Sequence, residues 1–293
     1  MTTTDHVIRV VPGNAALLAR TIEHELDDRW IRAFAASIND TRPEVFDLQQ
    51  VGGLLAHPVF PVCIEWPLIE HGAPGIELST DTLRLGLHVS HHIEIHAPLR
   101  AGRRVRTVAK PNLAQARTSA ALIGTRFRTY SEEGELLVTS DVYTLYPGVR
   151  LVGSRRAPEP PYLFARTAKT HLTPIEKFTV GICDAVIYTE CARIWNPIHT
   201  DIRVARAAGL PDTVLHGTAT LARAVTAVSR SEFAPENPSV TQVSCRFTGP
   251  VYPGTTLTIS ATHSDEGPVC FEVRADDGSP AISDGVISFQ EML

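Results

Sequence analysis

The sequence contains few cysteines, and their spacing argues against the usual structural roles of that residue. There are five in 293 residues, at Cys63, Cys183, Cys191, Cys245 and Cys270. Their number is odd, and they form neither a Cys-x-x-Cys motif nor the spacing of a zinc knuckle. We therefore expect reduced, mostly buried thiols rather than a disulfide framework or a zinc site.

Three further features are missing. No run approaches 18 apolar residues, so we expect no membrane span. The segment Met1–Val11 lacks the long apolar stretch of a signal peptide, and the expected location is the cytoplasm. The net charge of −5 gives no basic footprint for nucleic acid.

The 43% hydrophobic and 20% charged residues are typical of a folded protein, and the length suits two domains of about 100–150 residues.

The most informative pattern is an internal repeat. Residues 92–110 and 244–262 both read as an alternating strand, a Pro-x-x-x-Gly turn and a second alternating strand. The turns are Pro98 to Gly102 and Pro250 to Gly254. Downstream, residues 127–146 resemble residues 271–290, since both read as strand, acidic-glycine turn and strand.

Each pair of strands is preceded by a candidate apolar helix that begins at a histidine. These helices are expected over residues 57–72 and 216–230. A helix that is apolar on most faces should be buried. The pattern therefore predicts an α+β protein of two fused hot-dog domains, in each of which an antiparallel sheet wraps around a central helix. Because joining the halves would cover one sheet edge on each, we expect them to pack side by side as a pseudo-dimer.

A proline-rich segment separates the two repeats. Residues 148–164 contain Pro158, Pro160 and Pro161, which indicate a stiff, extended connection. We place the domains at residues 1–154 and 155–293.

One segment of the second half combines residues that are suited to chemistry. Asn196-Pro197-Ile198-His199 is a turn that ends in a histidine, followed by a cap at Thr200 or Asp201 for a short helix that Gly209 would end. His216-Gly217 then opens the long apolar helix. Free backbone N–H groups at such a helix start can stabilise a developing negative charge.

Residues 188–222 resemble the signature of the MaoC-like, (R)-specific enoyl-CoA hydratases. In that family an Asp-x-Asn-Pro-Leu/Ile-His loop is followed by a His-Gly pair at the start of the hot-dog helix. The resemblance implies that His199 is the general base or acid, that the N–H of Gly217 binds the thioester oxygen, and that Asn196 shapes the loop. It also implies a hydratase or dehydratase that interconverts trans-2-enoyl and (R)-3-hydroxyacyl thioesters, on coenzyme A or a carrier protein, in fatty acid metabolism.

The aspartate of this motif is absent, because Ile194 occupies its position. Loss of a positioned acid or base typically costs about 10²–10⁴-fold in rate. Candidate replacements are Glu190, Asp184, Asp201 and Asp40. When Pro43 is matched to Pro197, Asp40 falls where Ile194 falls, and Val45 falls where His199 falls. The first half therefore keeps the acid and lacks the base, which predicts a single site in the second half, with the first half forming the substrate tunnel.

Several interpretations remain open for the site. His216 and Asn196 each have a structural alternative, as loop-bonding and turn-forming residues. An enzyme is favoured, while a non-catalytic acyl-thioester-binding or partner protein and a thioesterase, with Glu65 as its helix carboxylate, are the alternatives. No cofactor is expected. No metal is expected either, since alternation separates His91 from His92 and His96. The chain is expected to be a homodimer or a pseudo-dimeric monomer, with activity falling below pH ~6.5, the ordinary pKa of histidine.

Overall fold

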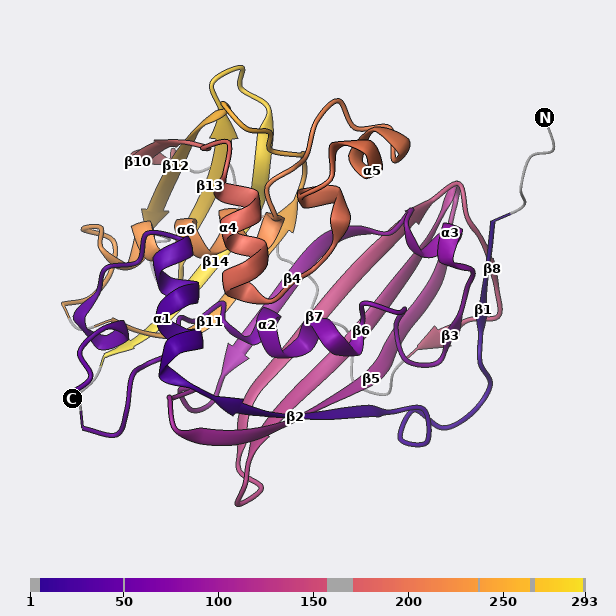
Figure 1. The fold of residues 1–293 in the computed structure, drawn as a ribbon, viewed down its shortest axis with the longest axis horizontal. Coiled ribbons are helices and arrows are strands. Elements are labelled where there is room, and N and C mark those ends of the chain that lie inside the picture. The colour runs from indigo at the N-terminus through magenta and orange to yellow at the C-terminus, as the bar shows by residue number, and fades with distance from the viewer. Residues whose placement is uncertain (1–5, 50, 157–170, 237, 264–266, 292–293) are drawn as a thin grey trace.

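The computed structural model describes residues 6–49, 51–156, 171–236, 238–263 and 267–291 (Figure 1). The elements of the first half are β1 (Val7–Val10), β2 (Arg20–Leu26), α1 (Asp28–Ser37), η1 (Pro43–Val45), α2 (Pro61–Glu65), η2 (Trp66–Leu68), β3 (Ile76–Glu77), α3 (Thr80–Leu83), β4 (Leu87–Ile95), β5 (Arg103–Arg117), β6 (Ala120–Ser131), β7 (Leu136–Pro147), β8 (Arg150–Val152) and β9 (Arg155–Arg156). The second half contains β10 (Thr173–Thr179), α4 (Asp184–Ala192), η3 (Pro197–His199), α5 (Ile202–Ala207), α6 (Gly217–Ser229), β11 (Pro238–Phe247), β12 (Thr256–His263), β13 (Val269–Ala275) and β14 (Pro280–Glu291).

One large antiparallel sheet runs through both halves. Its strand order is β10-β12-β13-β14-β11-β4-β7-β6-β5-β2, and β9 pairs with β5. The halves meet where β11 pairs with β4, with Ser244 opposite His92. This pairing confirms the expected edge-to-edge pseudo-dimer. A small separate sheet has the order β3-β1-β8.

The internal repeat is visible in the backbone as well as in the sequence. The turns after β4 and β11 each contain a glycine with positive φ, Gly102 at 76° and Gly254 at 84°, a conformation that other residues rarely adopt. Helix α1 is followed by Asn39, and helix α4 by Arg193, both with a φ of 58°. A short 3₁₀ helix then begins with a proline in each half, η1 in the first and η3 in the second.

The central helices of the two halves differ in length. Helix α6 agrees closely with the helix expected over residues 216–230. The helix expected over residues 57–72 is much shorter, because α2 ends at Glu65 and a 3₁₀ turn follows. Proline explains the difference. Pro61 is tolerated in the first turn of α2, whereas Pro67 has no N–H for a helix interior and forces a new start.

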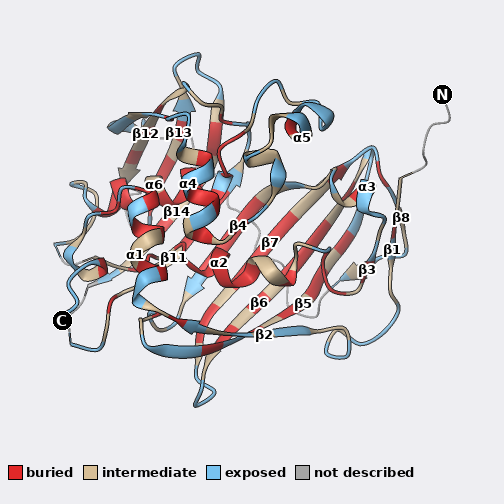
Figure 2. Cartoon of the chain, in the orientation of Figure 1, coloured by how far each residue is buried: buried red, intermediate tan, exposed pale blue. Residues whose placement is uncertain are grey.

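The core is continuous across the two halves. A single cluster of buried side chains includes Phe34 and Ile93 from the first half and Tyr188 and Val243 from the second. Figure 2 shows the buried bands where α1, α2, α4 and α6 lie against the sheet. A shared core means that the halves fold against each other rather than as separate units.

The predicted boundary near residue 155 stays a prediction. Arg155–Arg156 still pairs with β5 of the first half, and the rest of the proline-rich segment, from residue 157 to 164, lies outside the described residues. In the part of the chain that the structure describes, no helix is long and apolar enough to cross a membrane.

Candidate functional site

The loop that precedes α5 is held in place by local caps. The side chain of Asn196 accepts a hydrogen bond from the N–H of Ile198 at 3.4 Å, which starts η3. The carboxylate of Asp201 accepts from the N–H of Arg203 at 2.9 Å and caps α5, as the sequence predicted. These caps fix the position of His199 at the end of η3. The structure thus gives Asn196 a turn-forming contact.

His199 is oriented by the backbone of the loop before α6. Its Nδ1 lies 2.7 Å from the carbonyl oxygen of Val214, which can only accept, so Nδ1 donates and Nε2 is left with its lone pair. Burial lowers the pKa of His199 to about 4, although the Val214 carbonyl opposes the shift. Neither cause is a carboxylate. A half-buried, neutral imidazole with a free Nε2 can act as a base.

The ring of His216 packs against the ring of His199. The two rings stack with centroids 3.5 Å apart and an interplanar angle of 22°. Nε2 of His216 lies 3.4 Å from both the Thr189 hydroxyl and the Ile194 carbonyl oxygen. Burial, with a further contribution from His199, lowers the pKa of His216 well below its ordinary value. Two stacked rings avoid repulsion when both are neutral, so His216 can hold the imidazole of His199 in a fixed orientation.

Gly217 begins α6 immediately after this pair. In the described residues, its N–H donates to no backbone carbonyl, as expected for the first turn of a helix. A Cβ added at Gly217 would lie 2.8 Å from Cδ1 of Phe247, closer than real side chains approach. Only glycine therefore fits between the helix start and β11. Thr218 follows Gly217 in the helix, and its hydroxyl accepts a hydrogen bond from the hydroxyl of Tyr188 at 3.0 Å.

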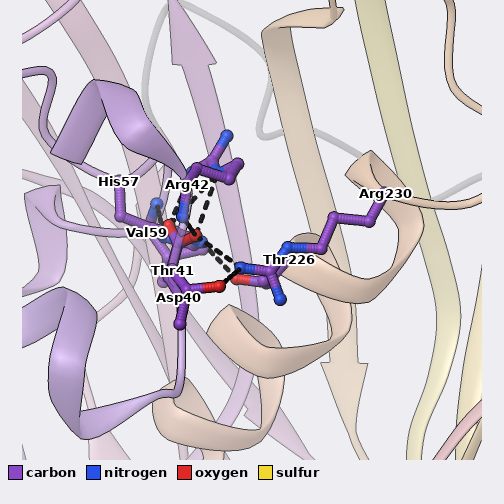
Figure 3. Close-up of polar contacts among 7 residues, drawn as sticks. All are labelled: Asp40, Thr41, Arg42, His57, Val59, Thr226 and Arg230. Carbon is purple, nitrogen blue, oxygen red and sulfur yellow. Dashed lines mark hydrogen bonds and ion pairs between the residues drawn. The ribbon is translucent and has the colours of Figure 1, made fainter. Parts of the chain in front are cut away.

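The position of the missing acid is closed to solvent. Ile194 is 6% exposed and belongs to the apolar core. The residue that occupies the matching place in the first half, Asp40, is fully buried at the other end of α6 (Figure 3). It bonds to Arg42 at 2.8 Å and to Arg230 at 3.2 Å. Arg230 caps the end of α6, which is roughly 20 Å long at about 1.5 Å per residue.

The structure therefore does not bring Asp40 to His199. His57, the counterpart of His216, lies with Asp40 and bonds to Thr226 at 3.1 Å (Figure 3). The first half thus retains a polar cluster at the place that mirrors the site. It lacks the imidazole of His199, because Val45 is buried there.

The other candidate acids already have partners. Glu190 is exposed and lies 3.5 Å from the indole N–H of Trp195. Asp184 binds Arg223 at 3.0 Å, on the first turn of α4. Asp201 binds Arg203 at 2.6 Å. None of these contacts includes His199.

Sequence reasoning missed the residues that shape the site from other elements. The Val214 carbonyl selects the tautomer of His199, and Phe247 closes the space against Gly217. Every residue has a backbone carbonyl, so the type of residue 214 does not indicate this contact. Phe247 could have been noticed as the last apolar residue of the strand before the Pro250 turn.

Comparisons with known proteins agree with this geometry. The family model described as "MaoC like domain" matches residues 164–281, and that described as "FAS1-like, dehydratase domain region" matches residues 18–140. The chain is similar to 3-hydroxyacyl-thioester dehydratase Y of Mycobacterium tuberculosis, with 30% identity over 219 residues, 69% of this chain and 72% of the relative. It spans less than two thirds of the length of several other curated relatives.

Solved structures show the same fold at low sequence identity. A MaoC-like dehydratase from Phytophthora capsici superposes with a TM-score of 0.80 at 17% identity, over 95% of this chain and 98% of the other. A conserved Mycobacterium tuberculosis protein described as having a double hotdog fold superposes with a TM-score of 0.63 at 16% identity, over 93% and 96%. These structures confirm the predicted double hot-dog fold. Because the chain is also similar to the dehydratase over more than two thirds of both sequences, it belongs to the MaoC-like family of acyl-thioester hydratases and dehydratases.

Proposed function

We propose that the chain interconverts trans-2-enoyl and (R)-3-hydroxyacyl thioesters. The observation that supports this most directly is the His199 ring, which stacks on His216 at the start of α6. Its Nδ1 donates to Val214, and its Nε2 has no hydrogen-bond partner in the part of the chain that the structure describes. The acyl group is joined to coenzyme A or to a carrier protein. Curated relatives with these activities, an enoyl-CoA hydratase and a 3-hydroxyacyl-thioester dehydratase, support the substrate class.

Hydration would begin with the thioester oxygen at the N–H of Gly217. Nε2 of His199 takes a proton from water as the water oxygen bonds to Cβ, and the electron pair of the double bond moves toward the thioester oxygen. The resulting enolate is stabilised by a donor at a helix N-terminus. The proton then passes from His199 to Cα, which restores the neutral imidazole and completes the addition.

A single histidine must perform both proton transfers in this scheme. Ile194 cannot exchange a proton, and the candidate carboxylates described above are engaged elsewhere. One base that serves both carbons delivers water and proton to the same face. The absence of the second group should make turnover slow, since a positioned acid typically contributes about 10²–10⁴-fold.

The test is loss of the enoyl-thioester absorbance with a panel of trans-2-enoyl-CoA substrates. His199→Ala should reduce turnover by about 10²–10⁴-fold, whereas His71→Ala, at an exposed histidine, should not. Ile194→Asp should raise the rate if the loop keeps its geometry, because it restores the motif aspartate two residues before Asn196. Undiminished turnover in His199→Ala would disprove the proposal.

The buried Ile194 also favours a second candidate function, an acyl-thioester-binding protein without turnover. Binding of acyl-CoA by a wild-type chain that hydrates no substrate in the panel would establish that alternative.

A further inference from the structure

A group of buried polar atoms between α2 and β4 has no hydrogen-bond partner among the described residues. It comprises both carboxyl oxygens of Glu65, Nδ1 of His91 and Nε2 of His88. Glu65 and His91 are each 1% exposed. Native proteins leave few buried polar atoms unpaired, because each one costs free energy comparable to a lost hydrogen bond. Four such atoms on three neighbouring side chains favour a polar ligand at this place.

The geometry holds these side chains close together. Nε2 of His91 lies 3.5 Å from a carboxyl oxygen of Glu65 and 2.8 Å from the Ser140 hydroxyl. The rings of His88 and His91 have centroids 5.3 Å apart. Residues three apart on a regular strand point to opposite faces, but β4 has an irregularity in its pairing with β7 between His88 and Ser90. This β-bulge turns both rings to the side of α2.

A row of contacts connects this polar group with the proposed catalytic site. The ring of His88 lies 4.6 Å from the ring of Phe247. Phe247 in turn is the side chain that lies directly against Gly217. Glu65 thus reaches the helix start only through contacts of His91, His88 and Phe247, so a ligand atom bound by Glu65 would be remote from a thioester carbonyl at Gly217.

The donors and acceptors of Glu65, His88 and His91 restrict which ligand can bind. Glu65 offers carboxyl oxygens, and His88 and His91 offer ring nitrogens. Burial, together with His91, lowers the pKa of His88 to about 3, so the ring stays neutral near pH 7. An unsubstituted acyl chain would add no hydrogen bond to any of these atoms. A hydroxyl group can donate to a carboxyl oxygen and accept from a ring N–H at the same time.

We propose that Glu65, His88 and His91 recognise a hydroxyl group on the acyl chain of the substrate, remote from the thioester. The preferred substrates would then be hydroxylated acyl thioesters rather than plain fatty acyl thioesters. This inference rests on the proposed function in one respect, that the site beside Gly217 holds an acyl thioester. It does not require turnover.

The test compares binding of two series of saturated acyl-CoA ligands of equal length. One series is unsubstituted, and the other has a single hydroxyl that is moved along the chain beyond C3. By isothermal calorimetry, the wild-type chain should bind one hydroxyl position about 10–100-fold more tightly than the unsubstituted ligand. Glu65→Leu, of similar size, should remove or reverse that preference, and Glu44→Gln, a carboxyl change in η1 of the first half, should keep it.

His88→Phe provides a second variant that retains a ring, in case Glu65→Leu does not fold. It should reduce the same preference. Equal affinity of the wild-type chain for both series would overturn the inference. So would a Glu65→Leu variant with unchanged ligand preference and a uniform loss of kcat on all enoyl-CoA substrates, since that result would give Glu65 a role in the chemistry. Preferential binding without any turnover would support the inference and disprove the proposed hydratase activity.

Discussion

His199 illustrates how the surroundings of one side chain set the pH range in which it works. The ordinary pKa of histidine led to the expectation that activity falls below pH ~6.5. Burial instead lowers the pKa of His199 to about 4. The base must be neutral to accept a proton. Hydratase activity should therefore persist below pH 6.5 and fall only as the pH approaches about 4.

The measurement is kcat/KM against pH from 4.5 to 8 on the folded protein, with far-UV circular dichroism at each pH as the control for folding. A decline in kcat/KM centred at pH 6.5, with the dichroism unchanged, would contradict the assignment of His199 as a base that is neutral above about pH 4.

Gly217 is constrained by its neighbour rather than by its backbone conformation. Gly217→Ala places a Cβ against Phe247 and should displace the N–H that faces the thioester oxygen. Loss of one such donor costs about 10²–10³-fold in kcat. The double variant Gly217→Ala with Phe247→Ala removes the clash and should recover part of that loss. Steady-state kinetics of both variants test this, and a double variant no faster than the single one would show that the clash is not the cause.

The site residues that the sequence predicted are those that lie in a local pattern. His199 and Gly217 lie in short motifs at a fixed spacing, and both are found at one place in the fold. Asp40 matched the motif by alignment of the two halves. The structure places it at the opposite end of α6, where it binds the capping residue Arg230.

At the scale of elements, α6 links the two halves through its ends. Its first residue, Gly217, lies in the proposed site, and its capping residue, Arg230, binds Asp40 in the mirror position. Burial alone would raise the pKa of Asp40, but the hydrogen bond from Arg42 and neighbouring positive charges lower it overall. The cluster therefore stabilises the docking of α6 on the first half at neutral pH.

Asp40→Asn should destabilise the fold and leave the hydratase rate unchanged. Removal of one member of a buried ion pair costs about 3–5 kcal/mol. Because Arg42 and Arg230 keep 18% and 35% of their side chains exposed, we expect about 2 kcal/mol. Urea unfolding measures this, with Asp28→Asn on the exposed face of α1 as the matched control. A folded Asp40→Asn variant without activity would show that Asp40 serves the site.

Elements were predicted well where a pattern repeats and poorly where proline interrupts it. The strands of both halves follow from alternation and from the Pro-x-x-x-Gly turns. The helix over residues 57–72 was expected to be as long as its partner because its residues are apolar. Three prolines within it, at 58, 61 and 67, limit α2 to Pro61–Glu65.

At the scale of the whole molecule, buried histidines make stability depend on pH. Burial lowers the pKa of His57 to about 3 and that of His92 and His199 to about 4. Each takes up a proton in the unfolded chain near pH ~6.5, while the folded protein does not. Their contribution to stability is thus complete above pH 6.5 and is lost progressively as the pH falls toward 4.

The free energy of unfolding should decrease by about 1.2 kcal/mol for each such histidine between pH 6 and 5. Urea unfolding at a series of pH values measures the slope. His57→Gln should reduce it by one histidine's share, and His71→Gln, at an exposed position, should not. A free energy of unfolding that does not change between pH 7 and 5 would contradict this expectation.

The joining of the sheet at β4 and β11 has a consequence for synthesis of the chain on the ribosome. Residues 90–94 of β4 pair with residues 242–246 of β11, roughly 150 positions later. At about 5–20 residues per second, one edge of β4 stays unpaired for about 8–30 s after it has been made. An open strand edge can pair with another chain. The histidines and Glu94 make β4 a polar strand. Its open edge in the nascent first half is therefore poorly suited to aggregate with neighbouring chains.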